Sequence, residues 1–144
     1  MAKKPMRVLP VLSERSGPFW TGGEKGELRF LHCEECGTII HPPTPLCPQD
    51  HSKRLHWKPV SGRARVATFT VNHQPWLPGL EIPYVVAIIE IEEQPSVRLM
   101  TNIVNCAPEA VRIGMPVRAV FEHHRDDEGD VWVPLFEPDP GREG

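Results

Sequence analysis

The sequence lacks a long apolar run. No stretch of the 144-residue chain approaches the roughly 18 consecutive apolar residues that a membrane-spanning helix needs. The basic segment 1–7 is not followed by the apolar core or the small-residue cleavage site of a secretory signal. These absences predict a cytoplasmic protein that does not associate with a membrane.

The chain also lacks an excess of positive charge. Sixteen Lys and Arg residues stand against nineteen Asp and Glu residues, which gives a formal net charge of −3. Nucleic-acid binding depends mostly on cations that neutralise phosphates. Arg63 and Arg65, on one expected strand, are the only support for a basic groove. The charge therefore argues against a nucleic-acid partner, although a single-strand-binding OB-fold remains an alternative.

Long helices have little room in this sequence. Its 17 prolines, roughly twice the average usage, exclude a helix bundle or coiled coil. One short helix is predicted to begin near Ser16, where a Gly-Pro pair follows a capping residue. It would carry Phe19 and Trp20 and would end within two or three turns, because three glycines follow.

No arrangement typical of a catalytic centre is present. The seven histidines form no helical pair and stand at no catalytic spacing from a serine or carboxylate. Cys106 follows an expected strand and is predicted to be a small buried apolar residue rather than a reactive thiol. We therefore predict no catalytic residues in this chain.

From residue 62 onward, β-branched and aromatic residues predict strands. The expected strands are residues 63–71, 84–91, 97–103, 117–122 and 131–135. A helical turn is expected at 108–112, and a hairpin turn at 126–130. Five strands with a helical element after the third predict a small OB-type Greek-key barrel.

The segment that precedes the barrel carries a metal-binding pattern. Cys33 and Cys36 have the spacing of a zinc knuckle, and Cys47 precedes a proline as in a second knuckle. About thirty residues cannot bury a sufficient core without a metal or disulfides. Structural zinc is the favoured interpretation, ahead of a metal-free ribbon that docks on the barrel and of a catalytic zinc. The fourth ligand stays open: Asp50 has the register of a missing cysteine, and His51 has the more usual donor.

The segment between the first two barrel strands, residues 73–80, carries exposed apolar groups. Trp76, Leu77 and Leu80 lie on an irregular segment, where binding residues often occur. Such anchors suit an interface, and a loop folded back over the barrel end is an equal alternative. Together with Phe19 and Trp20, these residues form the predicted partner-binding set.

The order of short motifs along the chain, from about Gly17 to Glu137, resembles a known family. The motifs are Pro18-Phe19-Trp20, Cys33-x-x-Cys36-Gly37, Pro42-Pro43, Cys47-Pro48, Trp57, Ser61-Gly62, Phe69-Thr70-Val71, Pro83-Tyr84-Val85-Val86-Ala87, Thr101-Asn102-Ile103-Val104 and Val111-Arg112-Ile113-Gly114-Met115-Pro116-Val117. They resemble the acyl-CoA-associated OB-fold proteins with an N-terminal rubredoxin-like zinc ribbon, long described as a domain of unknown function. The departure is Asp50, where the family usually has its fourth cysteine.

This resemblance implies a mainly β architecture: an N-terminal arm and short helix (1–27), a zinc ribbon (28–60), a five-stranded OB-fold barrel (61–138) and a tail (139–144). It further implies a non-catalytic accessory subunit of a thiolase-superfamily enzyme that handles acyl-CoA. Such enzymes include acyl-CoA thiolases, acyltransferases and the aldolases that shorten steroid side chains in lipid metabolism. Besides the single-strand-binding OB-fold, the alternative outside this role is a stand-alone acyl-CoA binder or hydrolase, with phosphate contacts from Lys53, Arg54 and Lys58.

Overall fold

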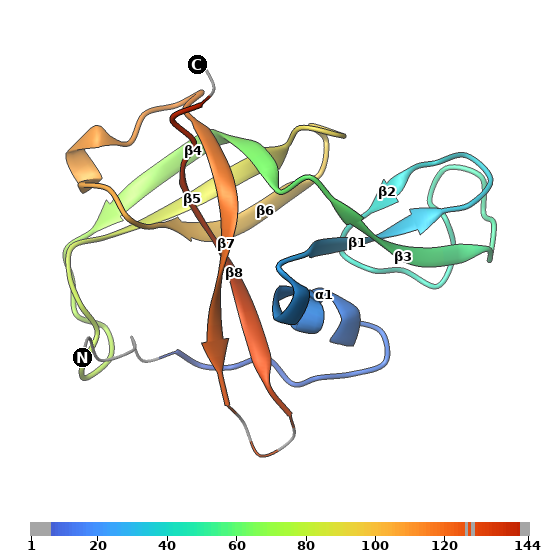
Figure 1. The fold of residues 1–144 in the computed structure, drawn as a ribbon, viewed down its shortest axis with the longest axis horizontal. Helices are drawn as coiled ribbons and strands as arrows, with labels where there is room; N and C mark the ends of the chain where they lie inside the picture. The colour runs from blue at the N-terminus through green and yellow to red at the C-terminus, as the bar shows by residue number, and fades with distance from the viewer. Residues whose placement is uncertain (1–6, 126, 128, 142–144) are drawn as a thin grey trace.

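The computed structural model describes residues 7–125, 127 and 129–141, and Figure 1 shows two β-structures joined through a short connection. The smaller is a three-stranded antiparallel sheet in the order β2-β1-β3. Its strands are β1 (Leu28–Cys33), β2 (Ile39–Ile40) and β3 (Leu55–Val60). We call residues 28–60 the ribbon.

The larger structure is a closed barrel with the strand order β4-β5-β6-β8-β7. Its strands are β4 (Arg63–Asn72), β5 (Tyr84–Ile91), β6 (Arg98–Ile103), β7 (Pro116–His124) and β8 (Val131–Pro138), with the 3-10 turn η2 (Pro108–Ala110) between β6 and β7. The predicted fold class, mainly β with a five-stranded OB-type barrel, is confirmed. The hairpin turn expected at 126–130 includes positions 126 and 128, and the tail includes 142–144; these lie outside the described residues, as do residues 1–6 of the arm.

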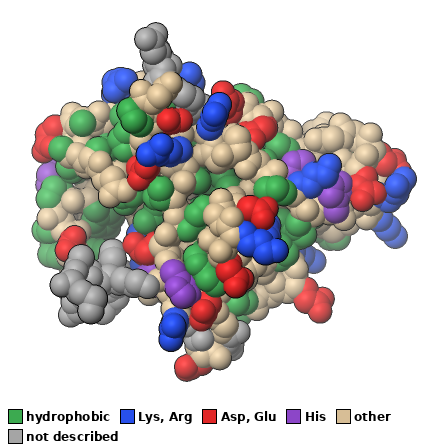
Figure 2. All heavy atoms as spheres, viewed as in Figure 1, with side chains coloured by type: hydrophobic (Ala, Val, Ile, Leu, Met, Phe, Trp, Pro, Cys, Tyr) green, Lys and Arg blue, Asp and Glu red, His purple; other side chains and the backbone are tan. Residues whose placement is uncertain are grey.

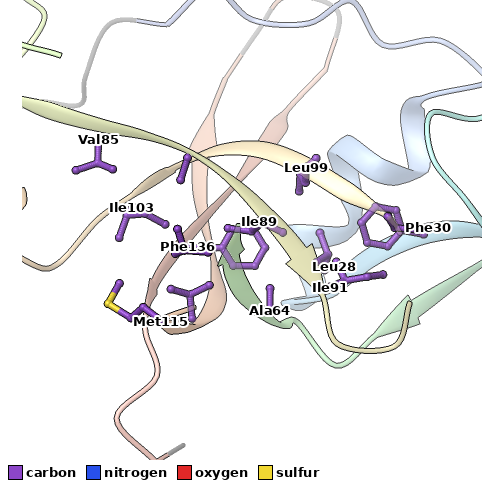
Figure 3. Close-up of a cluster of buried hydrophobic side chains, with 14 of the residues drawn as sticks. Leu28, Phe30, Ala64, Val85, Ile89, Ile91, Leu99, Ile103, Met115 and Phe136 are labelled. Carbon is purple, nitrogen blue, oxygen red and sulfur yellow. The ribbon is translucent and has the colours of Figure 1, made fainter. Parts of the chain in front are cut away.

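Successive side chains of a strand point to opposite faces of the sheet, and this alternation determines which of them fill the barrel. In β5, every second residue from Val85 to Ile91 is buried, and the residues between them are half-buried. The largest fully buried barrel side chain is Phe136 of β8, which lies in the centre of this cluster (Figure 3). An apolar residue at each alternate position therefore gives the barrel a single interior core.

That core extends beyond the barrel into the ribbon and the N-terminal helix. Leu28 and Phe30 of β1 belong to the same buried cluster as Ile91 and Leu99 of the barrel (Figure 3). Phe19 of the helix joins it through ring contacts with Phe30.

A second, smaller core of four buried residues lies under the ribbon knuckles and contains Leu31, Cys33, Ile40 and Cys47. The ribbon thus depends on the barrel for part of its apolar burial.

The helix is shorter than the sequence predicts. Helix α1 covers only Gly17–Thr21, and the 3-10 turn η1 (Gly22–Lys25) completes the segment. A Cβ on Gly23 would lie 2.4 Å from the Cβ of Trp132, so this glycine permits the close approach of the segment to the β7–β8 hairpin. No helix among residues 7–125, 127 and 129–141 is long and apolar enough to cross a membrane.

A side-chain amide joins the ribbon to the barrel. Gln94, in the turn after β5, accepts a hydrogen bond from the backbone N–H of Ile39 and donates one to its carbonyl, both at 2.9 Å. Ile39 lies on β2 and is buried. The amide thereby satisfies both backbone groups of a buried residue in the other structure.

Replacing Gln94 with alanine is expected to destabilise the ribbon. The Ile39 backbone groups lose their partners, and an unsatisfied buried polar group costs about 1–3 kcal/mol. Hydrogen exchange at the Ile39 amide and urea unfolding would measure the loss. Gln74→Ala, at an exposed position, is the control. Equal stability of the two variants would contradict the joining role of Gln94.

Candidate metal centre and apolar groove

The structure brings three thiols and one carboxylate together in the ribbon. One ligand atom from each of Cys33, Cys36, Cys47 and Asp50 lies within 4.8 Å of all the others. The Sγ atoms of Cys36 and Cys47 are 3.6 Å apart, and the Cys33 Sγ atom is 3.6 Å from either carboxylate oxygen of Asp50. These four groups converge on one point from two separate turns.

The two turns have the same backbone design. The N–H of Gly37 donates to the Cys33 carbonyl at 3.0 Å, and the N–H of His51 donates to the Cys47 carbonyl at 2.9 Å. Gly37 has φ +76° and His51 has φ 61°, both in the left-handed region. Asp50 is therefore the counterpart of Cys36, and His51 is the counterpart of Gly37. His51 does not join the ligand cluster.

The donor set fits a tetrahedral zinc ion. Zn–S bonds of about 2.3 Å and Zn–O bonds of about 2.0 Å place neighbouring ligand atoms about 3.5–3.8 Å apart. The sulfur–sulfur and sulfur–oxygen separations of 3.6 Å in the structure lie in that range. Four protein ligands leave no open position for a substrate, as in structural sites. The ribbon cysteines and Asp50 thus fit structural zinc.

The protonation of these ligands reflects their surroundings. Burial raises the pKa of the Cys47 thiol to about 11. Hydrogen bonds from Thr38 lower the pKa of Cys36, and the backbone N–H of Ser52, 2.9 Å from Oδ1, lowers the pKa of Asp50. Because a metal binds the thiolate form, zinc would have to displace the Cys47 proton.

A second feature is an apolar groove with a cavity volume of about 720 Å³, which lies between the N-terminal segment, the 73–83 loop and the β5–β6–β8 side of the barrel. All five residues of the predicted partner-binding set line it: Phe19, Trp20, Trp76, Leu77 and Leu80. The buried barrel residues Leu99 and Ile103 also line it. The structure therefore brings together two predicted segments that lie more than fifty positions apart in the sequence.

Within that set, the exposure of the side chains differs. Trp76 is 70% exposed, and its indole N–H donates to Asn72 at 3.2 Å, which orients the ring. Phe19 is only 5% exposed and packs on Phe30 and His41, with ring centroids 5.9 and 5.2 Å away. Phe19 belongs to the predicted partner-binding set, but the ribbon and the barrel together bury its ring, so it offers little surface to a partner.

Cys106 also borders the groove. It is half-buried and packs against the main core, and burial raises the pKa of its thiol. A raised pKa disfavours the thiolate that a nucleophile needs. These properties agree with a packing role for Cys106.

A polar cluster attaches the N-terminal arm to the rim of the groove, a contact that no sequence motif indicates. The Arg7 guanidinium donates to Glu122 and, at 3.0 Å, to Asn102. His124 lies 2.6 Å from the same Glu122 carboxylate. Burial acts to raise the pKa of Glu122, but the hydrogen bonds from Arg7 and His124 outweigh it and hold the pKa below its ordinary value.

Acid is expected to release this arm. A carboxyl group whose pKa is lowered by folding stabilises the folded arrangement above its ordinary pKa of about 4.3, and the stabilisation disappears as the pH falls through the folded-state value. The NMR chemical shift of the Arg7 Nε atom, which donates to Glu122, should therefore move to its free position as the pH falls below the ordinary carboxyl pKa. In Glu122→Gln it should lie near the free position already at pH 7. An Arg7 shift that is independent of pH and equal in both proteins would contradict the attachment.

Comparison with protein families supports the two-part architecture. Residues 20–56 match the family model described as the ChsH2 rubredoxin-like zinc ribbon domain, and residues 57–122 match the model of the ChsH2 C-terminal OB-fold domain.

Curated and solved proteins resemble the same two parts. The chain is 39% identical over 102 residues to a DUF35 domain-containing scaffold protein of Methanocaldococcus jannaschii, covering 69% of this chain and 71% of that protein. It is 37% identical over 125 residues to the 3-oxo-4,17-pregnadiene-20-carboxyl-CoA hydratase alpha subunit of Mycobacterium tuberculosis. That match covers 87% of this chain, which spans about two fifths of the hydratase subunit. A solved chain of the Ltp2-ChsH2(DUF35) aldolase matches with TM-score 0.77 and 33% identity, over 90% of this chain and 98% of that one.

Proposed function

This chain belongs to the DUF35 family, whose ChsH2-type members join a rubredoxin-like zinc ribbon to an OB-fold barrel, and from that membership we propose that it is a non-catalytic accessory subunit of an acyl-CoA enzyme. The observation that carries the proposal is the match along nearly the whole length of the DUF35 chain in an aldolase assembly. The partner is a thiolase-superfamily protein, as the family resemblance implies. A steroid side-chain aldolase is one such enzyme, and a thiolase or acyltransferase is another.

In this proposal the ribbon is a zinc-stapled structural element. Cys33, Cys36, Cys47 and Asp50 hold the ion, and they take no part in the reaction. The separations among their ligand atoms support the assignment. Their role is to keep the ribbon folded, because its own core contains only four buried residues.

The apolar groove contributes the partner contact. Trp76 and Leu77 are exposed at its rim, and Trp20 and Leu80 are partly exposed beside them. Exposed aromatic residues at the edge of an apolar groove are typical interface anchors. The partner supplies the reactive groups, and this chain supplies a surface that completes or stabilises the acyl-CoA site.

Co-expression with a candidate thiolase-superfamily partner is expected to give a stable complex that turns over acyl-CoA. The chain alone should show no turnover, and the partner alone should lose solubility or activity. Size-exclusion chromatography and an acyl-CoA cleavage assay would test both statements. A fully active partner without this chain, or turnover by this chain alone, would overturn the accessory role; the latter result would favour the stand-alone hydrolase.

A further inference from the structure

Two histidines face each other across the ribbon sheet, away from the cysteine cluster. His32 of β1 and His56 of β3 are directly paired in the antiparallel register. Their ring centroids are 6.3 Å apart, and the rings are inclined by 31°. Because side chains alternate along a strand, His32 lies on the opposite face of β1 from Cys33. The pair is thus separate from the proposed zinc site.

The Nδ1 atoms of both rings are directed toward oxygen atoms of the protein. Nδ1 of His32 lies 2.9 Å from the carbonyl oxygen of Phe30, so this nitrogen carries the proton and donates it. Nδ1 of His56 is buried and lies 3.2 Å from Oε1 of Glu34, without the alignment of a hydrogen bond. A small rotation of the ring would turn this contact into one. The other carboxylate oxygen of Glu34 is held by Arg54 at 3.2 Å.

This arrangement is the one that metal-binding histidines adopt. A ligating imidazole usually donates its second ring N–H to a carbonyl or a carboxylate, which sets the tautomer and leaves the other nitrogen for the metal. Phe30 and Glu34 stand in these two roles for His32 and His56. The Nε2 atom of each ring then has the lone pair that a metal requires.

The separation of the rings agrees with a shared ion. Two imidazoles that bind one ion at about 2.1 Å have ring centroids roughly 4.5–6.5 Å apart, depending on the angle at the metal. The observed 6.3 Å lies in this range, at its upper end. The His56 side chain is 29% exposed, so an ion can reach the pair. Figure 2 shows that histidine, basic and acidic side chains lie together at the surface of the ribbon lobe.

We propose that His32 and His56 form a second transition-metal site, in which their Nε2 atoms bind one divalent ion and water fills its remaining positions. Imidazole ligands suit nickel, copper and zinc, whereas thiolates select zinc over the harder ions. The ion would link β1 to β3 on the face opposite the cysteines. This inference does not depend on the accessory-subunit role.

Nickel is the probe that separates this pair from the thiolate cluster. The zinc-loaded full chain is titrated with Ni²⁺ by calorimetry, and the retained zinc is measured by elemental analysis. One Ni²⁺ should bind per chain without loss of zinc. His32→Asn and His56→Asn should each weaken Ni²⁺ binding at least tenfold, and Glu34→Ala should weaken it roughly tenfold through the loss of ring orientation.

The control is His73→Asn, which removes an exposed histidine from the 73–83 loop. Its Ni²⁺ affinity should equal that of the unmodified chain. Unchanged zinc content and circular dichroism would show that each variant is folded. Ni²⁺ binding that persists in His32→Asn or His56→Asn, or that falls equally in His73→Asn, would overturn the proposal, as would stoichiometric displacement of zinc.

Discussion

Replacing Cys33 with serine is expected to abolish zinc binding and to unfold most of the ribbon. Structural zinc sites contribute about 10–16 kcal/mol of apparent binding free energy, which is also folding free energy. Few apolar contacts in the ribbon could replace this free energy. The core under the knuckles consists of four buried residues, and two of them are Cys33 and Cys47. Zinc content should fall from about one ion per chain to near zero.

The unfolding should stop partway along β1. Leu28, Phe30 and Ile39 lie in the main core with the barrel, so the first half of β1 and the Ile39 amide should keep their hydrogen-exchange protection, while the ligand-bearing turns at 33–37 and 47–55 lose theirs. Cys106→Ser is the matched control, because Cys106 lies outside the cluster. A Cys33→Ser protein that retains stoichiometric zinc would contradict the assignment.

The fourth ligand can be tested in the same experiment. Asp50→Ala should lose zinc, because its carboxylate takes the place of Cys36 in the second turn. His51→Ala should retain zinc, since its ring is not part of the cluster. Loss of zinc in His51→Ala alone would assign the imidazole as the ligand instead. Asp50→Cys, which restores a four-thiolate set, should bind zinc more tightly than the unmodified chain.

Truncating Trp76 to alanine is expected to weaken assembly with the partner enzyme by roughly 10- to 30-fold, or about 1.4–2 kcal/mol. The indole is exposed, yet its hydrogen bond to Asn72 holds it in one orientation, which lowers the entropy lost on binding. The dissociation constant of the complex, measured by biolayer interferometry, would give the change. The fold should be unaffected, because Trp76 is not part of either core.

Ile113→Ala is the matched control for Trp76. Ile113 has the same exposed fraction, 70%, and lies between η2 and β7, away from the residues that line the groove. If the groove is the interface, only the Trp76 variant should lose affinity. Equal losses, or none in either variant, would move the partner contact to another surface.

The ribbon chemistry could be predicted in large part from the sequence, because it depends on local spacing. The Cys33/Cys36 pair and the Cys47 turn each lie within a few residues of chain. The choice between Asp50 and His51 could be made only from the backbone conformation. His51 has a left-handed φ, as Gly37 has, and this conformation places Asp50 in the ligand position. Glycine is the usual residue for that conformation, so a histidine, although enriched there among the other residues, did not by itself signal the turn.

Contacts between distant segments could not be predicted. The attachment of Arg7 to Glu122 joins residues 115 positions apart, and the contact of Gln94 with Ile39 spans 55 positions. No local periodicity carries such information. The β7–β8 hairpin is also longer than the alternating apolar residues predict, because its strand pairing continues to His124↔Val131. At this end the His123 ring stacks on Trp132, with ring centroids 4.5 Å apart.

The cluster that Leu28 and Phe30 share with the barrel has a consequence for protein engineering. The chain passes from β3 to β4 through only two residues, so a cut at Ser61–Gly62 looks like a natural place to separate the parts. A barrel isolated in this way would expose the surface that these two side chains and Phe19 cover. We expect such a fragment to aggregate. A fragment that begins before α1 retains the three side chains that cover this surface and should remain monodisperse.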